Sequence, residues 1–140
     1  MNPKLWGESA WKFLHYVTFA YPNNPSIIEK NNYKNFFLDL TNVLPCHVCK
    51  ENYKEHLKKL PLTDNVLSNK FSLVIWLFNV HNEVNTSLGR KRFNFDTFIS
   101  DYLGEKRGYS RSKIFVSFII LISLTLFLIL ILGYHSLGEK

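Results

Sequence analysis

The feature that most limits the fold of this 140-residue chain is a run of 19 residues without a charge, from Ile114 to Leu132. As an α-helix the run would be about 28 Å long, close to the hydrocarbon thickness of a bilayer. A buried core helix is the alternative, but a small domain cannot surround a helix that is apolar on every side. Only eight residues follow the run. We therefore expect a tail-anchored chain with a single-pass transmembrane helix at 114–132.

The positive charge of the chain is concentrated beside this run. Residues 106–113 carry four basic side chains and no acidic one, whereas residues 1–105 carry 12 Lys or Arg against 10 Asp or Glu. The formal net charge of +6 is thus largely a local cluster. This argues against nucleic-acid binding, which needs a basic patch across the folded domain. Because the cluster precedes the run, the positive-inside rule places residues 1–113 in the cytoplasm.

The spacing of apolar residues in the first 105 positions predicts a compact bundle of helices. We expect helices at about 6–19, 26–43, 45–57, 68–88 and 95–103, joined by short loops. Ser26 suits the start of the second helix and Gly89 the end of the fourth. No segment shows sustained alternation of apolar and polar residues, so we expect no sheet.

The domain organisation that follows has four parts. Residues 1–105 form the folded domain, and residues 106–113 form a basic linker. The transmembrane helix occupies 114–132, and a short tail follows at 133–140.

The two cysteines of the chain, Cys46 and Cys49, form one Cys-x-x-Cys pair at a predicted helix start. Amide dipoles there favour a thiolate, and the three-residue offset keeps the sulfurs close enough to bridge. In a cytosolic domain such a pair is rarely structural, which leaves redox chemistry or half a zinc site. Structural zinc needs four ligands, and His47, His56 and His81 lack the compact spacing of a zinc finger. Redox chemistry is the favoured hypothesis and a metal site the alternative.

Two other groups of polar and aromatic residues share a helix face. Gly7, Trp11 and His15 follow one another at four-residue spacing in the first predicted helix, and His81 and Asn85 do so in the fourth. Polar side chains on a largely apolar helix are costly to bury without partners. These residues form either a buried network in the core or a binding site for a heteroaromatic ligand, and both interpretations stay open.

Several short motifs follow one another in a fixed order along the chain. They are Trp6 to His15 (WGESAWKFLH), Tyr21-Pro22, Pro45-Cys46-x-x-Cys49, and His81 to Asn85 (HNEVN) followed by Leu88-Gly89. This ordered set resembles the Erv/ALR family of FAD-linked sulfhydryl oxidases over about residues 3–103. The resemblance implies a four-helix bundle with a short fifth helix, non-covalently bound FAD and a homodimer. The expected fold class is this all-α bundle followed by the C-terminal transmembrane helix.

Carried over position by position, the resemblance also implies the site residues. Cys46 would face the substrate, and Cys49 would lie against the isoalloxazine ring of FAD. The implied cofactor-binding residues are Gly7, Trp11, His15, His81, Asn82, Val84, Asn85, Leu88, Arg90 and Tyr102. Leu44 stands where the family usually has an aromatic residue. Arg90 replaces a usual lysine, and Tyr102 aligns with a position that is often tryptophan. No metal ligand is implied.

The cysteine count narrows the kind of family member that the chain resembles. With no third cysteine, it cannot carry the second, shuttle disulfide of many members. This minimal form, with a membrane anchor and a cytoplasmic domain, resembles versions encoded by large cytoplasmic DNA viruses, so we expect a host or virion membrane.

The resemblance implies the reaction 2 R–SH + O2 → R–S–S–R + H2O2. A thioredoxin-like or other dithiol protein would then dock directly as the electron donor. The alternative is a non-enzymatic, tail-anchored adaptor whose Cys-x-x-Cys binds metal.

Overall fold

The computed structural model describes residues 1–104 and 118–125. The chain divides into two compact units, Met1–Tyr102 and Leu103–Lys140. All regular structure in the described residues is helical, which confirms the all-α class that the sequence predicts. The first unit holds the candidate site and is described below by itself.

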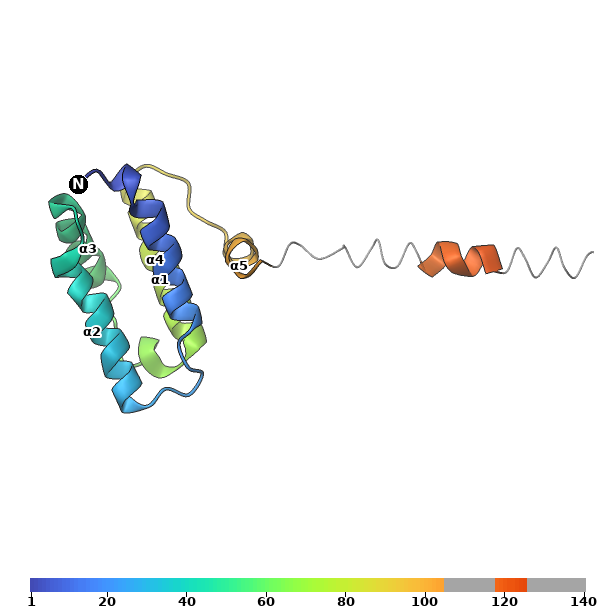
Figure 1. Cartoon of the computed structure of the whole chain (residues 1–140), viewed down its shortest axis with the longest axis horizontal. Coiled ribbons are helices and arrows are strands. Elements are labelled where there is room, and N and C mark those ends of the chain that lie inside the picture. The colour runs from blue at the N-terminus through green and yellow to red at the C-terminus, as the bar shows by residue number, and fades with distance from the viewer. Residues whose placement is uncertain (105–117, 126–140) are drawn as a thin grey trace, which may run out of the picture. The chain divides into compact units, whose positions relative to one another are not determined.

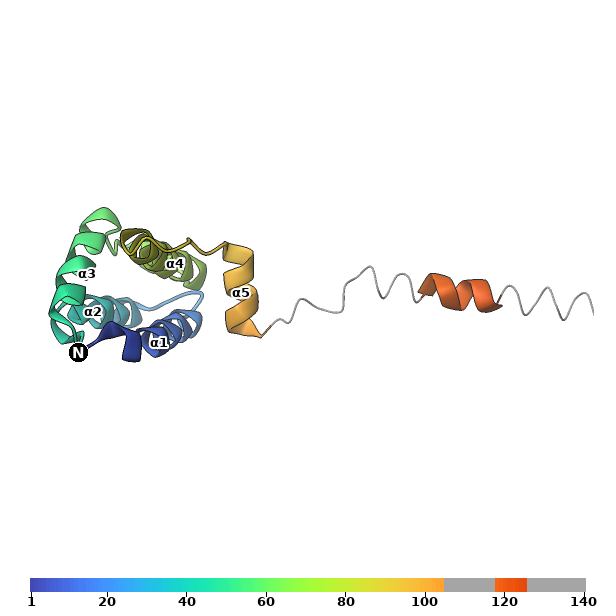
Figure 2. The same cartoon turned by 90° about the horizontal axis from the view of Figure 1, so that it is seen from above.

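Four long helices form the body of the first unit (Figure 1). The elements follow in the order η1 Pro3–Leu5, α1 Gly7–Phe19, α2 Ile27–Val43, α3 His47–Lys59, η2 Val66–Ser68, α4 Lys70–Ser87 and α5 Phe95–Leu103. Figure 2 shows α1, α2 and α4 close to end-on and α3 from the side, with the four helices around a common centre, while α5 runs across the direction of α1, α2 and α4.

Local chemistry explains where the long helices begin and end. Ser26 caps α2 with a capping box, in which the Ser26 side chain accepts from Glu29 N–H and the Glu29 carboxylate accepts from Ser26 N–H. Asn69 caps α4 by accepting from Ser72 N–H at 2.9 Å. After α4 the chain turns at Gly89, whose φ of 65° is a left-handed conformation that glycine adopts without strain.

The core is built around α4, whose residues Leu73, Leu77 and Val80 are fully buried. Trp76, also on α4, is fixed by a hydrogen bond of 2.9 Å from its indole N–H to the carbonyl oxygen of Leu60. Such burial on most sides explains why the sequence of α4 is so apolar. The bundle therefore holds α4 rigidly, and the polar residues of its last two turns occupy defined positions.

The connection between α3 and α4, which the sequence predicts to be a short loop, is partly ordered by the core. It contains η2, and Leu67 within that turn is buried. The hydroxyl of Tyr21 donates to the Leu67 carbonyl oxygen at 2.9 Å, which fastens the segment to the end of α1. This connection thus contributes an apolar side chain to the core.

The predicted transmembrane helix at 114–132 is wrong. Within the residues that the structure describes, no helix has the length and apolar character needed to cross a membrane. Of this run, the structure describes residues 118–125, which are helical. The rest of the run, the linker (106–113) and the tail (133–140) lie outside the described residues. The cytoplasmic orientation deduced from that helix stays a prediction.

Candidate active site

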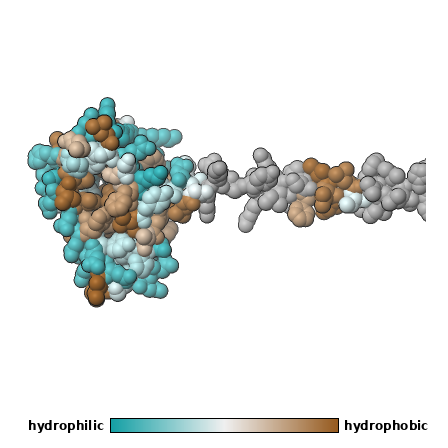
Figure 3. Space-filling model, viewed as in Figure 1, coloured by the Kyte–Doolittle hydropathy of each residue, from teal (hydrophilic) through white to brown (hydrophobic). Residues whose placement is uncertain are grey.

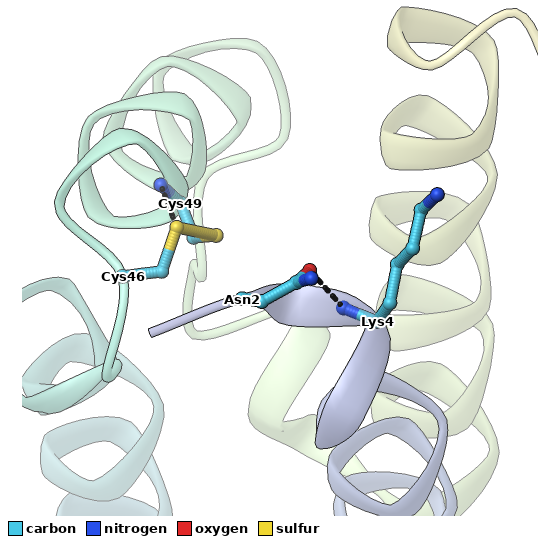
Figure 4. The surroundings of a disulfide bond; sticks show 4 residues. All are labelled: Asn2, Lys4, Cys46 and Cys49. Atoms are coloured by element: carbon cyan, nitrogen blue, oxygen red, sulfur yellow. Dashed lines mark hydrogen bonds between the residues drawn. A yellow bond between two sulfur atoms is a disulfide. The ribbon is translucent and has the colours of Figure 1, made fainter.

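A disulfide bond joins Cys46 and Cys49 where α3 begins, and both residues are half-buried (Figure 4). Their Cα atoms are 5.1 Å apart, so one helical turn brings the sulfurs together. The N-terminal segment lies beside the bond, with Asn2 and Lys4 in its surroundings. The pair is therefore at the end of the bundle where the chain also begins.

Cys46 precedes α3 instead of lying within it, which corrects the helix start expected at Pro45. Its backbone is extended, and its Sγ accepts a hydrogen bond from the Cys49 N–H at 3.2 Å. A sulfur in this capping position faces the free N–H groups of the helix end, and these groups stabilise negative charge. Once the bond is reduced, this contact favours a Cys46 thiolate, which is the form that reacts in disulfide exchange.

Three aromatic rings from α1 and α4 come together in the bundle. Trp11 stacks on His81 with ring centroids 3.9 Å apart and an interplanar angle of 6°. His15 Nε2 and His81 Nδ1 are 3.0 Å apart and share a hydrogen bond. The structure therefore unites the two groups of residues that the sequence placed on separate helix faces.

Both imidazoles of this cluster are neutral at physiological pH. Burial, with the nearby His81, lowers the pKa of His15 to about 3. Burial, with the charge of Arg90, lowers the pKa of His81 to about 4. In a neutral pair one nitrogen donates and the other accepts. His15 Nδ1 is also buried, and it has no hydrogen-bond partner within the described residues.

Helix α5 covers the outer side of His15. Phe98 and Tyr102 meet the His15 ring edge-on, with centroids 4.5 and 4.9 Å away. The Tyr16 hydroxyl donates to the Tyr102 carbonyl oxygen at 3.1 Å, which ties α5 to α1. Tyr102 thus reaches the histidine cluster, although sequence comparison aligned this position only loosely.

Asn82, a predicted cofactor residue, has its side-chain amide bound at both ends to the chain that follows α4. Its Oδ1 accepts from the Phe93 N–H at 2.7 Å, and its Nδ2 donates to the Phe93 carbonyl oxygen at 3.3 Å. This pair of bonds folds the segment after Gly89 back onto α4, where the Phe93 ring meets His81 edge-on at 4.9 Å. Asn82 therefore shapes the site through Phe93.

The remaining predicted residues are partly or fully exposed, or have a side-chain group without a hydrogen-bond partner. The side-chain Nδ2 of Asn85 is buried without a hydrogen-bond partner among the described residues. The backbone carbonyl oxygen of Asn85 accepts from Arg90 N–H at 2.8 Å. Val84 is half-buried, and Leu88 and Arg90 are exposed. At Gly7, the first residue of α1, a Cβ would meet no atom within 4 Å, so the space beside it is open.

Two residues with buried polar groups were not among the predicted cofactor-binding residues. The indole Nε1 of Trp6 and both ring nitrogens of His56 are buried and lack hydrogen-bond partners in the described part of the chain. Burial lowers the pKa of His56, with Lys59 adding to the effect. The only signals were the position of Trp6 directly before Gly7 and the three-residue step from Tyr53 to His56, which places both on the buried face of α3.

The structure gives no support to the metal-site alternative. Within residues 1–104 and 118–125, no three His, Cys, Asp or Glu side chains come close enough together to hold a metal ion. His56 and His81 thus do not join the cysteines in a ligand set.

Comparison with known proteins gives consistent matches. Residues 8–103 match the model of the Erv1 / Alr family. A mimivirus protein named for FAD-linked sulfhydryl oxidase activity, R368 of Acanthamoeba polyphaga mimivirus, is 44% identical over 95 residues. That match covers 68% of this chain and 66% of the relative, so the chain spans just under two thirds of the relative's length. The FAD-linked sulfhydryl oxidase of African swine fever virus is 30% identical over 97 residues, covering 69% of this chain and 79% of the relative.

The fold also matches solved structures. The FAD-binding domain of Erv1 from Saccharomyces cerevisiae superposes with a TM-score of 0.66 at 24% sequence identity, over 73% of this chain and 94% of that domain. At this identity the match establishes the fold.

Proposed function

Because the chain belongs to the Erv1 / Alr family, we propose that it is an FAD-linked sulfhydryl oxidase whose redox pair is Cys46 and Cys49. The reaction is 2 R–SH + O2 → R–S–S–R + H2O2. The observation that carries the proposal is the disulfide at the start of α3, with a backbone N–H aimed at Cys46 Sγ. This geometry produces a reactive thiolate and keeps its partner sulfur within bonding distance.

The polar groups of the bundle fit a large heteroaromatic cofactor. Trp11 and His81 present flat rings, and His15 Nδ1 and Asn85 Nδ2 are buried atoms still able to form hydrogen bonds. The open space beside Gly7 would allow close approach to the backbone at the α1 N-terminus. When bound, FAD supplies the two-electron chemistry that links thiols to O2.

The residues proposed to hold FAD keep the roles that the family resemblance implies. Gly7, Trp11 and His15 would contact it from α1, and Tyr102 from α5. The contacts from α4 and the segment after it would come from His81, Asn82, Val84, Asn85, Leu88 and Arg90. The exposed guanidinium of Arg90 suits the phosphates, because it is a permanent positive charge with several donors.

The exchange steps fall to the two cysteines. A substrate thiolate attacks Cys46 Sγ, which forms a mixed disulfide and releases Cys49 as a thiolate. A second substrate thiol then attacks the substrate sulfur of that mixed disulfide, which releases the oxidised substrate and leaves Cys46 as a thiolate stabilised by the Cys49 N–H. In this assignment Cys46 faces the substrate and Cys49 faces the cofactor.

The electron donor is proposed to be a thioredoxin-like or other dithiol protein. The chain has two cysteines, and both are used in the redox pair, so it supplies no shuttle disulfide of its own. A donor must therefore bring its thiols directly to Cys46 at the end of the bundle.

A homodimer is the proposed assembly, and an apolar groove between α1 and α2 supports it. Val17, Tyr33 and Phe36 line the groove together with Asn32. Phe13 at its edge is exposed and lies 6.3 Å from the Phe36 ring. Figure 3 shows apolar residues gathered over the face that α1 and α2 present in this view. Covering such a face with a second copy would remove apolar surface from water.

Cofactor analysis of the purified full-length protein tests the proposal against the adaptor alternative. We expect a yellow protein that releases one FAD per chain on heating and contains no stoichiometric zinc. A colourless protein that carries zinc would instead support the metal-binding adaptor.

A further inference from the structure

The chain has three tryptophans, and two of them show contrasting use of the indole N–H. Trp76 donates its N–H to the Leu60 carbonyl oxygen at 2.9 Å. The Nε1 of Trp6 is buried, yet it has no hydrogen-bond partner among the described residues. A buried N–H without an acceptor is costly, so native proteins rarely keep one unless something else accepts from it.

Two hydrogen bonds hold the backbone of Trp6 in place. Its N–H donates to the Pro3 carbonyl oxygen and closes η1, and its carbonyl oxygen accepts from Ala10 N–H at 2.9 Å in the first turn of α1. Trp6 thus caps α1 directly before Gly7, where the space is open. The unused indole N–H therefore belongs to a residue whose backbone is anchored at the α1 N-terminus.

This position is at the disulfide end of the bundle. Figure 4 shows the N-terminal segment with Asn2 and Lys4 beside the Cys46–Cys49 bond, and Trp6 follows that segment at once. Electrons can pass from the cysteine pair to FAD only if the isoalloxazine ring lies at this end. That ring has carbonyl oxygens and ring nitrogens that accept hydrogen bonds.

We propose that Trp6 is a further cofactor-binding residue, whose indole N–H donates to an acceptor atom of the isoalloxazine ring. The inference rests on the proposed function, because it requires bound FAD. It explains why this buried N–H lacks an acceptor among the described residues. A donor in this place stabilises added electron density on the ring, so it raises the reduction potential of the bound cofactor.

The test compares Trp6→Phe with Trp76→Phe in the full-length, FAD-loaded protein. Each variant keeps an aromatic ring and loses one indole N–H. For Trp6→Phe we expect FAD release, followed by flavin fluorescence, to be about tenfold faster, as the loss of one hydrogen bond implies, and the reduction potential of bound FAD to fall. For Trp76→Phe we expect a lower melting temperature with FAD release at the wild-type rate.

Two results would overturn the inference. If Trp6→Phe releases FAD at the wild-type rate with an unchanged reduction potential, the indole N–H does not bind the ring. If the wild-type protein itself binds no FAD, the proposed function fails first and takes this inference with it, so the two failures are distinguishable.

A measurement on the wild-type protein covers the case in which Trp6→Phe does not fold. In the ¹⁵N-labelled, FAD-loaded protein, the side-chain N–H signal of Trp6 is identified by its proximity to Gly7. We expect this signal to move when dithionite reduces the cofactor, while that of Trp76 stays in place. A Trp6 signal that does not respond to reduction would contradict the proposal.

Discussion

His15 Nε2 on α1 and His81 Nδ1 on α4 lie 3.0 Å apart in the buried interior of the bundle. The pair can share a proton only while at least one ring is neutral, and burial keeps both pKa values far below the ordinary 6.5. Trp11 stacks against the His81 side of the pair and α5 closes the His15 side. The His15–His81 pair therefore contributes to the stability of the bundle and is also part of the proposed cofactor site.

The first prediction concerns pH. In the unfolded chain the two histidines take up protons below about pH 6.5, whereas in the folded protein they do so only near pH 4 and 3. Stability is therefore complete above pH 6.5 and falls as the pH drops from 6.5 toward 4, by up to about 1.4 kcal/mol per pH unit for each ring. Urea unfolding between pH 7.5 and 4.5 measures this slope. His15→Gln should reduce the slope, whereas the control His47→Gln, at an exposed position, should leave it unchanged. Equal slopes in the wild-type protein and both variants would refute the account.

The second prediction concerns the ring stack. Trp11→Ala or His81→Ala removes a flat surface that we propose FAD occupies, so each should weaken FAD binding by about tenfold. Titration of the FAD-free protein, followed by flavin fluorescence, gives the dissociation constant. Phe71→Ala, at an exposed aromatic on the first turn of α4, serves as the control. An unchanged constant, with stability lost equally with and without FAD, would show that the stack is ordinary core.

The third prediction separates the two cysteines. Cys46→Ser and Cys49→Ser should each abolish thiol oxidation while the protein stays folded and yellow, because other residues bind the cofactor. Cys46→Ser leaves a free thiol at Cys49, the residue assigned to the flavin side. Its absorption spectrum should therefore show a long-wavelength charge-transfer band that Cys49→Ser lacks. Full turnover by either variant would eliminate the disulfide mechanism.

The fourth prediction concerns Asn82. Replacing it by alanine breaks both bonds to Phe93 and leaves the backbone groups of that residue without partners, so we expect a loss of about 1–3 kcal/mol in the free energy of unfolding. The segment from Gly89 to Phe93 should also become more sensitive to protease. Asn52→Ala, at an exposed position of α3, is the comparison. If the two variants unfold alike, the bonds to Phe93 contribute nothing to stability.

Sequence patterns predicted the helical elements well because their signals are local. Ser26 and Glu29 form the capping box within four residues, and Gly89 turns the chain at the end of α4. The start of α3 was predicted at Pro45, two residues before the observed start at His47, since sequence alone did not show that Cys46 would act as the cap. The apolar run at 114–132 satisfied the length rule for a membrane helix, but among the described residues no helix is long and apolar enough to cross a membrane.

The candidate site was harder to predict because its important contacts join distant parts of the chain. The pairing of His15 with His81 spans 66 positions, and the bonds from Asn82 reach Phe93 on a different segment. Family resemblance named candidate residues without showing these partners, and their roles toward FAD stay predictions. The missing hydrogen-bond acceptor of the Trp6 indole N–H could be recognised only from the structure, since a tryptophan before a helix is usually interpreted as a core residue.

The measurement that tests the central claim most directly is the stoichiometry of oxygen use by the purified, full-length protein with dithiothreitol as the dithiol. An oxygen electrode, a peroxide assay and thiol titration are run on the same sample. The account predicts one O2 consumed and one H2O2 formed for every two thiols lost, with none of these changes when Cys46 is serine. Thiol loss without oxygen uptake, or the same oxygen uptake by Cys46→Ser, would contradict the claim that this chain is a sulfhydryl oxidase acting through Cys46 and Cys49.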